Sequence, residues 1–169
     1  HGALLRLAGE LQVTVQHMAM QALNYRDNAP QDEASYSRDL KLYYQDLLDN
    51  TQQFGSVCRA FASGDFEQQQ MPGNLSMRPI LSDATMDAAY ALEVYWGAYL
   101  RDLKKQLGAS DMPKLAHAAE FIVDSNIELS NKTEDLLLAL DLDIKHRTEE
   151  TSYIIRMSFA IALLLSGGI

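Results

Sequence analysis

The chain has 169 residues, of which 47% are hydrophobic and 22% charged, and these values favour one folded domain with few disordered tracts. Its net charge of -9, without a cluster of lysine and arginine, argues against nucleic acid and anionic lipid headgroups as partners. The one cysteine, Cys58, excludes an internal disulfide framework and a cysteine-based zinc site.

The first predicted helix begins near the N-terminus. Its apolar residues recur at alternating steps of four and three: Leu4, Ala8, Leu11, Val15, Met18, Ala22 and Tyr25. This period of 3.5 residues is typical of helices that pack side by side in coiled coils and bundles. The segment RDNAPQDE (26–33) then ends the pattern with Pro30 and turn-forming residues.

A second helix is predicted from about Glu33 to Ser63. Its apolar face repeats every seven residues: Leu40, Leu47, Phe54 and Phe61, with Tyr43 and Val57 between them. Asn50 occupies a position on this face, where a polar residue that fixes helix register is favoured over a ligand contact. Cys58 is expected to be a small core residue rather than a reactive thiol.

An irregular stretch (63–79) separates this helix from a third, expected from about Ser82 to Leu107, with Ser82 or Asp83 at its N-cap. Gly108 marks its end. The predicted apolar face of the third helix comprises Met86, Ala89, Trp96, Leu100, Leu103 and Leu107. A short turn precedes a fourth helix, which starts at about Pro113 and contains no helix breaker before Gly167. We therefore predict an all-α protein, most simply an antiparallel up-down-up-down four-helix bundle.

The fourth helix is predicted to be far longer than the others. At about 1.5 Å per residue it would span about 80 Å, against roughly 40 to 50 Å for its partners. The excess includes Met157–Ile169, which carries no charged residue but is shorter than the roughly 20 residues that cross a bilayer. An up-down-up-down bundle places both chain ends at the same end. We expect a long fourth helix heading into a membrane, with a four-helix domain at 1–156 and the start of a transmembrane helix at 157–169.

The chain starts at His1 without an initiator methionine or a signal peptide, and we expect it to be a fragment of a longer protein. Its four histidines form no pair at the metal-binding i, i+4 spacing. Asp143 and His146 match one carboxylate–histidine motif of di-iron bundles, but a second such motif is missing. We predict no catalytic residue, no metal site and no cofactor.

Several segments resemble a known family. LAGELQVTVQHMAMQAL (7–23), FGSVCRAFASGDF (54–66), EVYWGAY (93–99) and FIVDSNIELSNKTEDLLLAL (121–140) occur in the order and spacing of four-helix sensor domains. These domains belong to type IV pili chemotaxis transducers (PilJ-like) and nitrate/nitrite sensor kinases (NarX-like). The similarity covers nearly the whole chain.

This resemblance implies a periplasmic ligand-sensing domain of an inner-membrane receptor, whose output is a kinase, a chemotaxis domain or a cyclic-dinucleotide enzyme. Such domains pair as homodimers, here through the first helix, and signal by helix displacement. The implied partners are a small-molecule ligand or a periplasmic binding protein, together with the membrane through flanking transmembrane helices. Nucleic acid is not among them.

The chain departs from the nitrate sensors at one position. Where those proteins hold the anion with an arginine, this chain has Gln12 or its neighbour Val13, and neither is cationic. Nitrate binding is therefore not expected. Gln12, Gln16 and His17 are candidate ligand-binding residues, and the alternative is that they face solvent or pair with another helix. The alternative function is a soluble helical adaptor or dimerisation bundle in which residues 157–169 pack inside a partner.

Overall fold

The computed structural model describes residues 2–69 and 81–167, and within these ranges every regular element is helical. Their order along the chain is α1 (Gly2–Asp27), α2 (Glu33–Asp39), η1 (Leu40–Tyr44), α3 (Gln45–Ser63), η2 (Glu67–Gln69), α4 (Asp83–Leu107) and α5 (Leu115–Gly167). The all-α prediction is confirmed. Most of the stretch predicted to be irregular, 63–79, lies outside the described residues.

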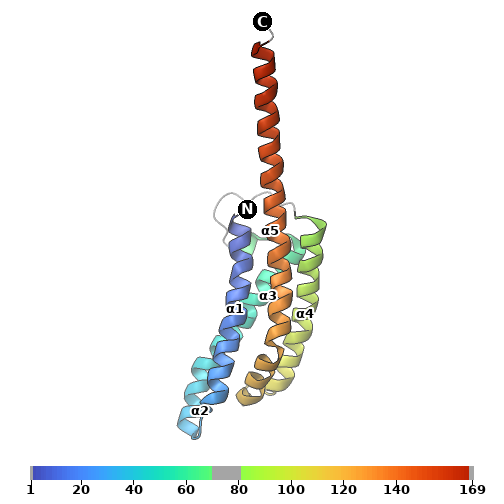
Figure 1. The fold of residues 1–169 in the computed structure, drawn as a ribbon. Coiled ribbons are helices and arrows are strands. Elements are labelled where there is room, and N and C mark those ends of the chain that lie inside the picture. The colour runs from blue at the N-terminus through green and yellow to red at the C-terminus, as the bar shows by residue number, and fades with distance from the viewer. Residues whose placement is uncertain (1, 70–80, 168–169) are drawn as a thin grey trace.

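The long helices lie side by side (Figure 1). Helix α1 contacts α3 and α5, and α4 contacts the same two helices, so that the four surround one core. In Figure 1, α1 begins at the end of the molecule from which α5 extends, whereas α2 lies at the opposite end. We refer to these as the α5-extension end and the α2 end.

The core follows the predicted pattern in α1 closely. All seven residues of its apolar repeat are buried, because each faces either α3 or α5. In α3 the seven-residue repeat also points inward: Leu47, Phe54 and Phe61 are at most 1% exposed, and Cys58 is buried among them. Asn50 donates a hydrogen bond to Asp46 in its own helix, 3.3 Å away.

The second predicted helix is continuous from Glu33 to Ser63 but contains a feature that was not predicted. Asp32 caps its start by accepting a hydrogen bond from the Ser35 backbone N–H at 2.7 Å. Residues Leu40–Tyr44 then form a π-helical turn before the α-helix resumes. Such turns are rare, shift the helical faces on either side, and occur frequently at functional sites.

The inner face of α4 corrects one prediction. Met86 is 46% exposed, and Thr85 takes the position on the inner face instead. A threonine is tolerated there because its hydroxyl donates to the Asp143 carboxylate of α5 at 2.6 Å. Further along α4, Trp96 packs on Phe54 of α3 with ring centroids 4.3 Å apart. Gly55 permits this approach, since a Cβ there would lie 3.0 Å from the indole nitrogen.

The predicted ends of α4 and the predicted start of α5 agree with the structure to within two residues. Ser82, not Asp83, is the N-cap of α4, and its hydroxyl accepts from the Thr85 backbone N–H at 3.2 Å. Gly108 ends the helix with φ of 71°, a conformation that glycine adopts at little cost. Helix α5 begins at Leu115, two residues later than predicted. The carbonyl of Pro113, just before it, accepts a hydrogen bond from Tyr36 Oη at 2.8 Å.

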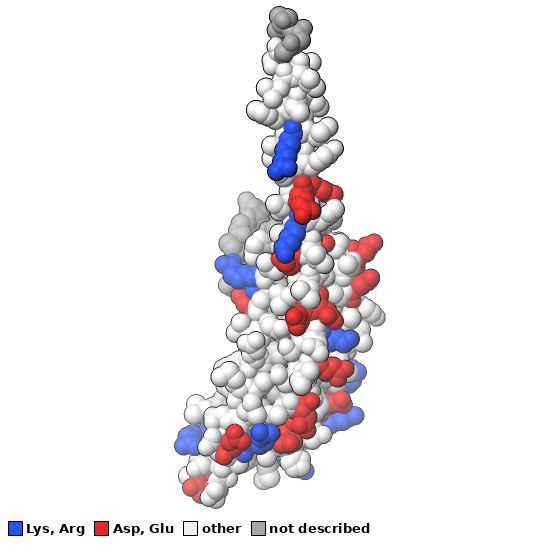
Figure 2. Space-filling view, in the orientation of Figure 1, with Lys and Arg blue, Asp and Glu red and all other residues white. Residues whose placement is uncertain are grey.

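Helix α5 extends far beyond the bundle (Figure 1). Its last fully buried side chain is Leu140, Ile144 is half-buried, and every residue from Thr148 to Ser166 is exposed. The predicted exposure at the end of the chain is confirmed for five large apolar residues: Phe159, Ile161, Leu163, Leu164 and Leu165. Residues 157–166 include no charged side chain, and Figure 2 shows no Lys, Arg, Asp or Glu on the visible face of the outer part of the α5 extension. None of the helices in the described ranges combines the length and hydropathy needed to cross a bilayer.

Candidate ligand-binding pocket

A pocket of about 390 Å³ lies near the α2 end of the bundle, between α1 and the π-helical turn. This volume lies in the range of small-molecule sites. Its walls come from the second half of α1, from Asn28 just after it, and from the helix that contains α2, η1 and α3. The lining residues are Gln21, Asn24, Tyr25, Asn28, Arg38, Asp39, Leu42, Tyr43 and Asp46. Most of these side chains are polar, which distinguishes the pocket from the apolar core beside it.

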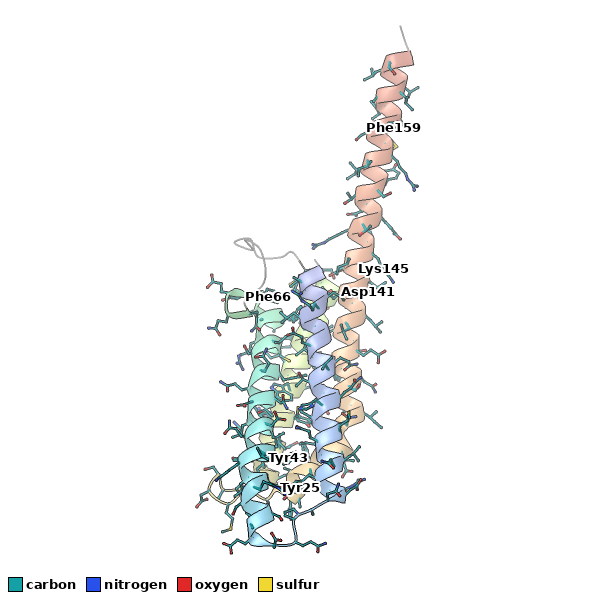
Figure 3. The ribbon with its side chains drawn as sticks, turned by 90° about the vertical axis from the view of Figure 1, so that its left-hand side faces the viewer. Tyr25, Tyr43, Phe66, Asp141, Lys145 and Phe159 are labelled. Carbon is teal, nitrogen blue, oxygen red and sulfur yellow. The ribbon has the colours of Figure 1, made fainter. Side chains whose placement is uncertain are left out.

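An aromatic pair forms one wall of the pocket. Tyr25 of α1 and Tyr43 of η1 stack with ring centroids 4.9 Å apart and planes inclined by 15° (Figure 3). Tyr43 belongs to the π-helical turn Leu40–Tyr44. The pocket is therefore built around the one irregular turn of the helix that spans Glu33–Ser63.

Two polar atoms at the pocket are buried without a hydrogen-bond partner. They are Gln21 Oε1 and the Tyr43 hydroxyl, and Gln12 Oε1 is the third such atom among the described residues. A buried polar group without a partner costs about 1 to 3 kcal/mol of folding free energy, and most native proteins contain few. Both atoms have almost no accessible surface, so they lie beneath the wall of the pocket rather than at its surface.

The charged groups of the pocket carry a net charge of about -1, from Arg38, Asp39 and Asp46. Arg38 Nε lies 3.6 Å from Asp39 Oδ1, and the arginine side chain is 66% exposed. One oxygen of Asp46, Oδ2, contacts His17 Nε2 at 3.1 Å and accepts from Asn50 at 3.3 Å. The pocket therefore presents carboxylate to its interior more than guanidinium.

Both tyrosines remain protonated at neutral pH. Burial raises the pKa of the Tyr25 phenol above its usual value, and the negative charge of Asp39 adds to the effect. Burial raises the pKa of Tyr43 further, with a contribution from Tyr25. The unpartnered Tyr43 hydroxyl can therefore donate one hydrogen bond and accept another.

The three residues proposed from the sequence lie in different places. His17 reaches the edge of the pocket through Asp46. Gln12 lies five positions earlier, about 140° around the helix axis, and therefore on the other flank of α1. Gln16 is exposed, and neither glutamine lines the pocket. None of the three residues therefore lines the pocket, and His17 alone contacts a residue that does.

Sequence reasoning missed the residues that define the site. Tyr43 was predicted to be an aromatic residue of the core or of a groove, without a polar role, and Gln21 was not considered. The available signal was the polar series Gln21, Asn24 and Asn28, three and four residues apart at the end of an otherwise apolar repeat. Asp143 and His146 do not act together, since Asp143 contacts Thr85 while His146 pairs with Glu150 at 2.9 Å. No group of three or more metal-ligating side chains occurs in residues 2–69 and 81–167.

Comparison of the chain with family models, with curated proteins and with solved structures finds no match. The function is therefore inferred from the residues and from their arrangement in the fold.

Proposed function

We propose that this chain is the extracytoplasmic ligand-sensing domain of a transmembrane receptor, similar to the PilJ-like and NarX-like domains. The observation that carries the proposal is the extension of α5, which leaves the bundle as an exposed helix and turns apolar after Arg156. Exposure of five large apolar side chains to water is unfavourable in free energy, and a bilayer would cover these side chains. The domain is then an antiparallel up-down-up-down bundle, periplasmic at 1–156 and entering the inner membrane at 157–169.

The pocket and the membrane end would communicate through helix displacement. The pocket lies between α1 and the helix that continues into α3, whereas α5 packs along α1. A ligand that draws α1 and η1 together changes the position of α1 against α5. Such a ligand shifts the receptor only as far as it binds the two arrangements with different affinity. Displacement along a helix axis is a known mode of signal transmission between packed helices.

The outer face of α1 supports a homodimer. Uncharged residues follow one another along it at steps of four and three, as in a second packing seam: Leu5, Gly9, Val13, Gln16, Met20 and Leu23. Val13 and Met20 are 66% and 70% exposed, and a Cβ added at Gly9 would meet no atom within 4 Å. Figure 2 shows few charges over the middle of α1. Two copies could pair along this face without like-charge repulsion, with Gln16 as a polar contact inside the seam.

Deletion of residues 157–169 tests the membrane proposal. We expect the shortened chain to melt at nearly the same temperature, because the deleted side chains that the structure describes pack on nothing, and to be more soluble. We also expect chain 1–169, but not chain 1–156, to float with phosphatidylcholine vesicles in a density gradient. A deletion that unfolds the bundle, or a full chain that ignores vesicles, would instead favour the soluble adaptor.

Substitution Val13→Glu tests the homodimer by sedimentation. In a symmetric pair, each copy would bring a carboxylate to the centre of the seam, and self-association should weaken or disappear. Val94→Glu on α4 is the matched control, since Val94 is similarly exposed at 55% but lies on a different helix. Association that both variants retain at millimolar concentration would place the interface elsewhere, and a strictly monomeric wild-type chain would remove it.

A further inference from the structure

We propose that the π-helical turn η1 is a two-state switch inside the helix Glu33–Ser63. In the second state, Leu40–Tyr44 form an ordinary α-helical turn, and α2 is rotated about its own axis relative to α3. The existence of this switch is independent of the proposed sensing function. Its use as the element that a signal shifts rests on that function.

The observed arrangement of η1 leaves polar groups without partners. Gln21 Oε1 on α1 and the Tyr43 hydroxyl on η1 are buried and make no hydrogen bond. Each such group costs folding free energy, and π-helical turns are themselves rare within α-helices. These costs narrow the free-energy gap between the observed arrangement and one in which the turn is α-helical. A narrow gap is the condition for two populated states.

The segment that would move is lightly held. No residue of α2 or η1 is buried, whereas α3 buries side chains on each of its turns from Leu47 to Phe61. Conversion of one π turn rotates α2 relative to α3 by about 100°, the angle of one residue on an α-helix. Because the rotation exposes no fully buried side chain, it costs little apolar burial.

The start of α5 is linked to this segment. Tyr36 of α2 donates a hydrogen bond from its hydroxyl to the Pro113 carbonyl at 2.8 Å, across 77 positions of the chain. Within the described ranges, no other hydrogen bond joins a side chain of α2 to a different long helix or its ends. A rotation of α2 by about 100° carries Tyr36 away from Pro113 and breaks this bond. The state of η1 therefore determines whether the start of α5 is held.

The pocket changes with the same rotation. Four of its lining residues belong to α2 or η1, namely Arg38, Asp39, Leu42 and Tyr43, and the facing wall belongs mainly to α1. Rotation of α2 changes the shape of the pocket. A molecule that fits one of the two shapes better shifts the population toward that state. The pocket, the π turn and the start of α5 thus form one coupled unit.

Nuclear magnetic resonance relaxation dispersion of the 169-residue chain in detergent tests the switch. Shifts of helix register occur in microseconds to milliseconds, the range that this measurement detects. We expect exchange at the backbone amides of Leu40–Tyr44 and of Lys114–Ala118, with one rate and one population for both segments. The amides of Phe54–Phe61 should show none. Absence of exchange at η1, or unrelated rates in the two segments, overturns the proposal.

Deletion of Leu42 should remove the switch. Leu42 is 65% exposed, and loss of one residue converts the π turn to an α-helical turn while α2 and α3 keep their faces. We expect an equal or higher melting temperature and no exchange at η1 or at Lys114–Ala118. Deletion of Gln52 is the control, since this exposed residue lies in regular α-helix, where a deletion turns one flank of the helix away from the core. Equal destabilisation by the two deletions overturns the proposal.

Tyr36→Phe tests the link to α5. Loss of the bond to Pro113 should raise the population of the second state about fivefold, because a typical hydrogen bond contributes that factor. Tyr153→Phe is the control, since Tyr153 is 65% exposed in the extension and should leave the population unchanged. A population that Tyr36→Phe does not change overturns the coupling. Vesicle flotation is independent of η1, so failure of the switch leaves the membrane proposal standing, and failure of flotation leaves the switch standing.

Discussion

The two parts of α5 differ in a way that composition alone would not indicate. From Leu115 to Ile144 the helix contains many charged residues, and yet its inner face is buried between α1 and α4. From Thr148 onward its described side chains are exposed, although the run after Arg156 is uncharged and far more apolar. Burial in this helix therefore follows the presence of neighbouring helices rather than local hydrophobicity.

This difference also separates what stabilises the fold from what the fold presents to its surroundings. The bundle part of α5 gains free energy by removing apolar surface from water. The extension gains none from this chain, and its length of helix is supported only by backbone hydrogen bonds and helix propensity. The same kind of substitution in the two parts of α5 should therefore change the free energy of unfolding by different amounts.

The largest difference is expected between two leucines. Leu136 is 0% exposed in the bundle and Leu164 is 77% exposed in the extension. Leu136→Ala should lower the free energy of unfolding by about 2 to 5 kcal/mol, because it removes buried methyl groups and leaves a cavity. Leu164→Ala should change it by less than about 0.5 kcal/mol. Urea denaturation followed by circular dichroism measures both, and equal losses would mean that the extension packs on the bundle.

An intermediate effect is expected where α5 leaves the bundle. The Asp143 carboxylate accepts hydrogen bonds from Thr85 Oγ1 at 2.6 Å and from the Ser82 backbone N–H at 3.1 Å. Asp143→Ala should cost about 1 to 2 kcal/mol, because two donors at the start of α4 lose a charged acceptor. The control is Asp141→Ala, which breaks an exposed ion pair with Lys145, visible in Figure 3, and should cost no more than about 0.5 kcal/mol.

The Asp143 contact should also depend on pH. Burial opposes ionisation of Asp143, but the hydrogen bonds from Ser82 and Thr85 and the charge of Arg147 outweigh it, so its pKa lies below the usual value. A carboxyl group with a lowered pKa in the folded state stabilises the protein above its usual pKa of about 3.9. The contribution is lost as the pH falls below that value. The stability difference between wild type and Asp143→Ala should therefore shrink in acid, and a constant difference from pH 7 to pH 2 would contradict this.

The smallest difference is expected between two threonines that make the same bond. Thr133 Oγ1 donates to the Leu129 carbonyl at 2.8 Å in the core, and Thr148 Oγ1 donates to the Ile144 carbonyl at 2.9 Å on the surface. Thr133→Val should cost about 1 kcal/mol, because no water can replace the bond at a buried site. Thr148→Val should leave the free energy of unfolding unchanged, since water can hydrogen-bond to the Thr148 hydroxyl and to the Ile144 carbonyl when the two are apart. Thermal denaturation resolves the pair, and an equal response would show that solvent reaches Thr133.

The sequence predicted those features that depend on local rules. Most of the inner face of α1 was identified because a 3.5-residue repeat defines one helix face, but Leu7 and Ala19, which are also buried, were not predicted to lie on it. The ends of α4 were predicted because Ser82 and Gly108 have the side chain and the backbone freedom that helix ends require. Met86 was placed wrongly because the alternative, Thr85, depends on a hydrogen bond to a carboxylate 58 residues further along the chain.

The pocket was beyond prediction for a similar reason. The π-helical turn has no recognisable signature in the residues Leu40–Tyr44, so its position could not be predicted from the sequence. The contact between His17 and Asp46 joins residues 29 positions apart. Gln21 becomes an unpartnered acceptor only once the neighbouring helix covers it. The composition of a helix indicates which faces are buried, and the partners of each polar group follow only from the fold.

The burial of Cys58 gives the protein a reporter of its own motions. The side chain is 1% exposed, and burial raises the pKa of its thiol, with the charge of Glu93 on α4 adding to the effect. Because the thiolate is the reactive form, a thiol reagent can modify Cys58 only when α3 separates from its neighbours. The chain contains no other cysteine. The rate of labelling of the unmodified protein therefore measures how often the bundle opens, and a signal molecule that draws its helices together should slow that reaction.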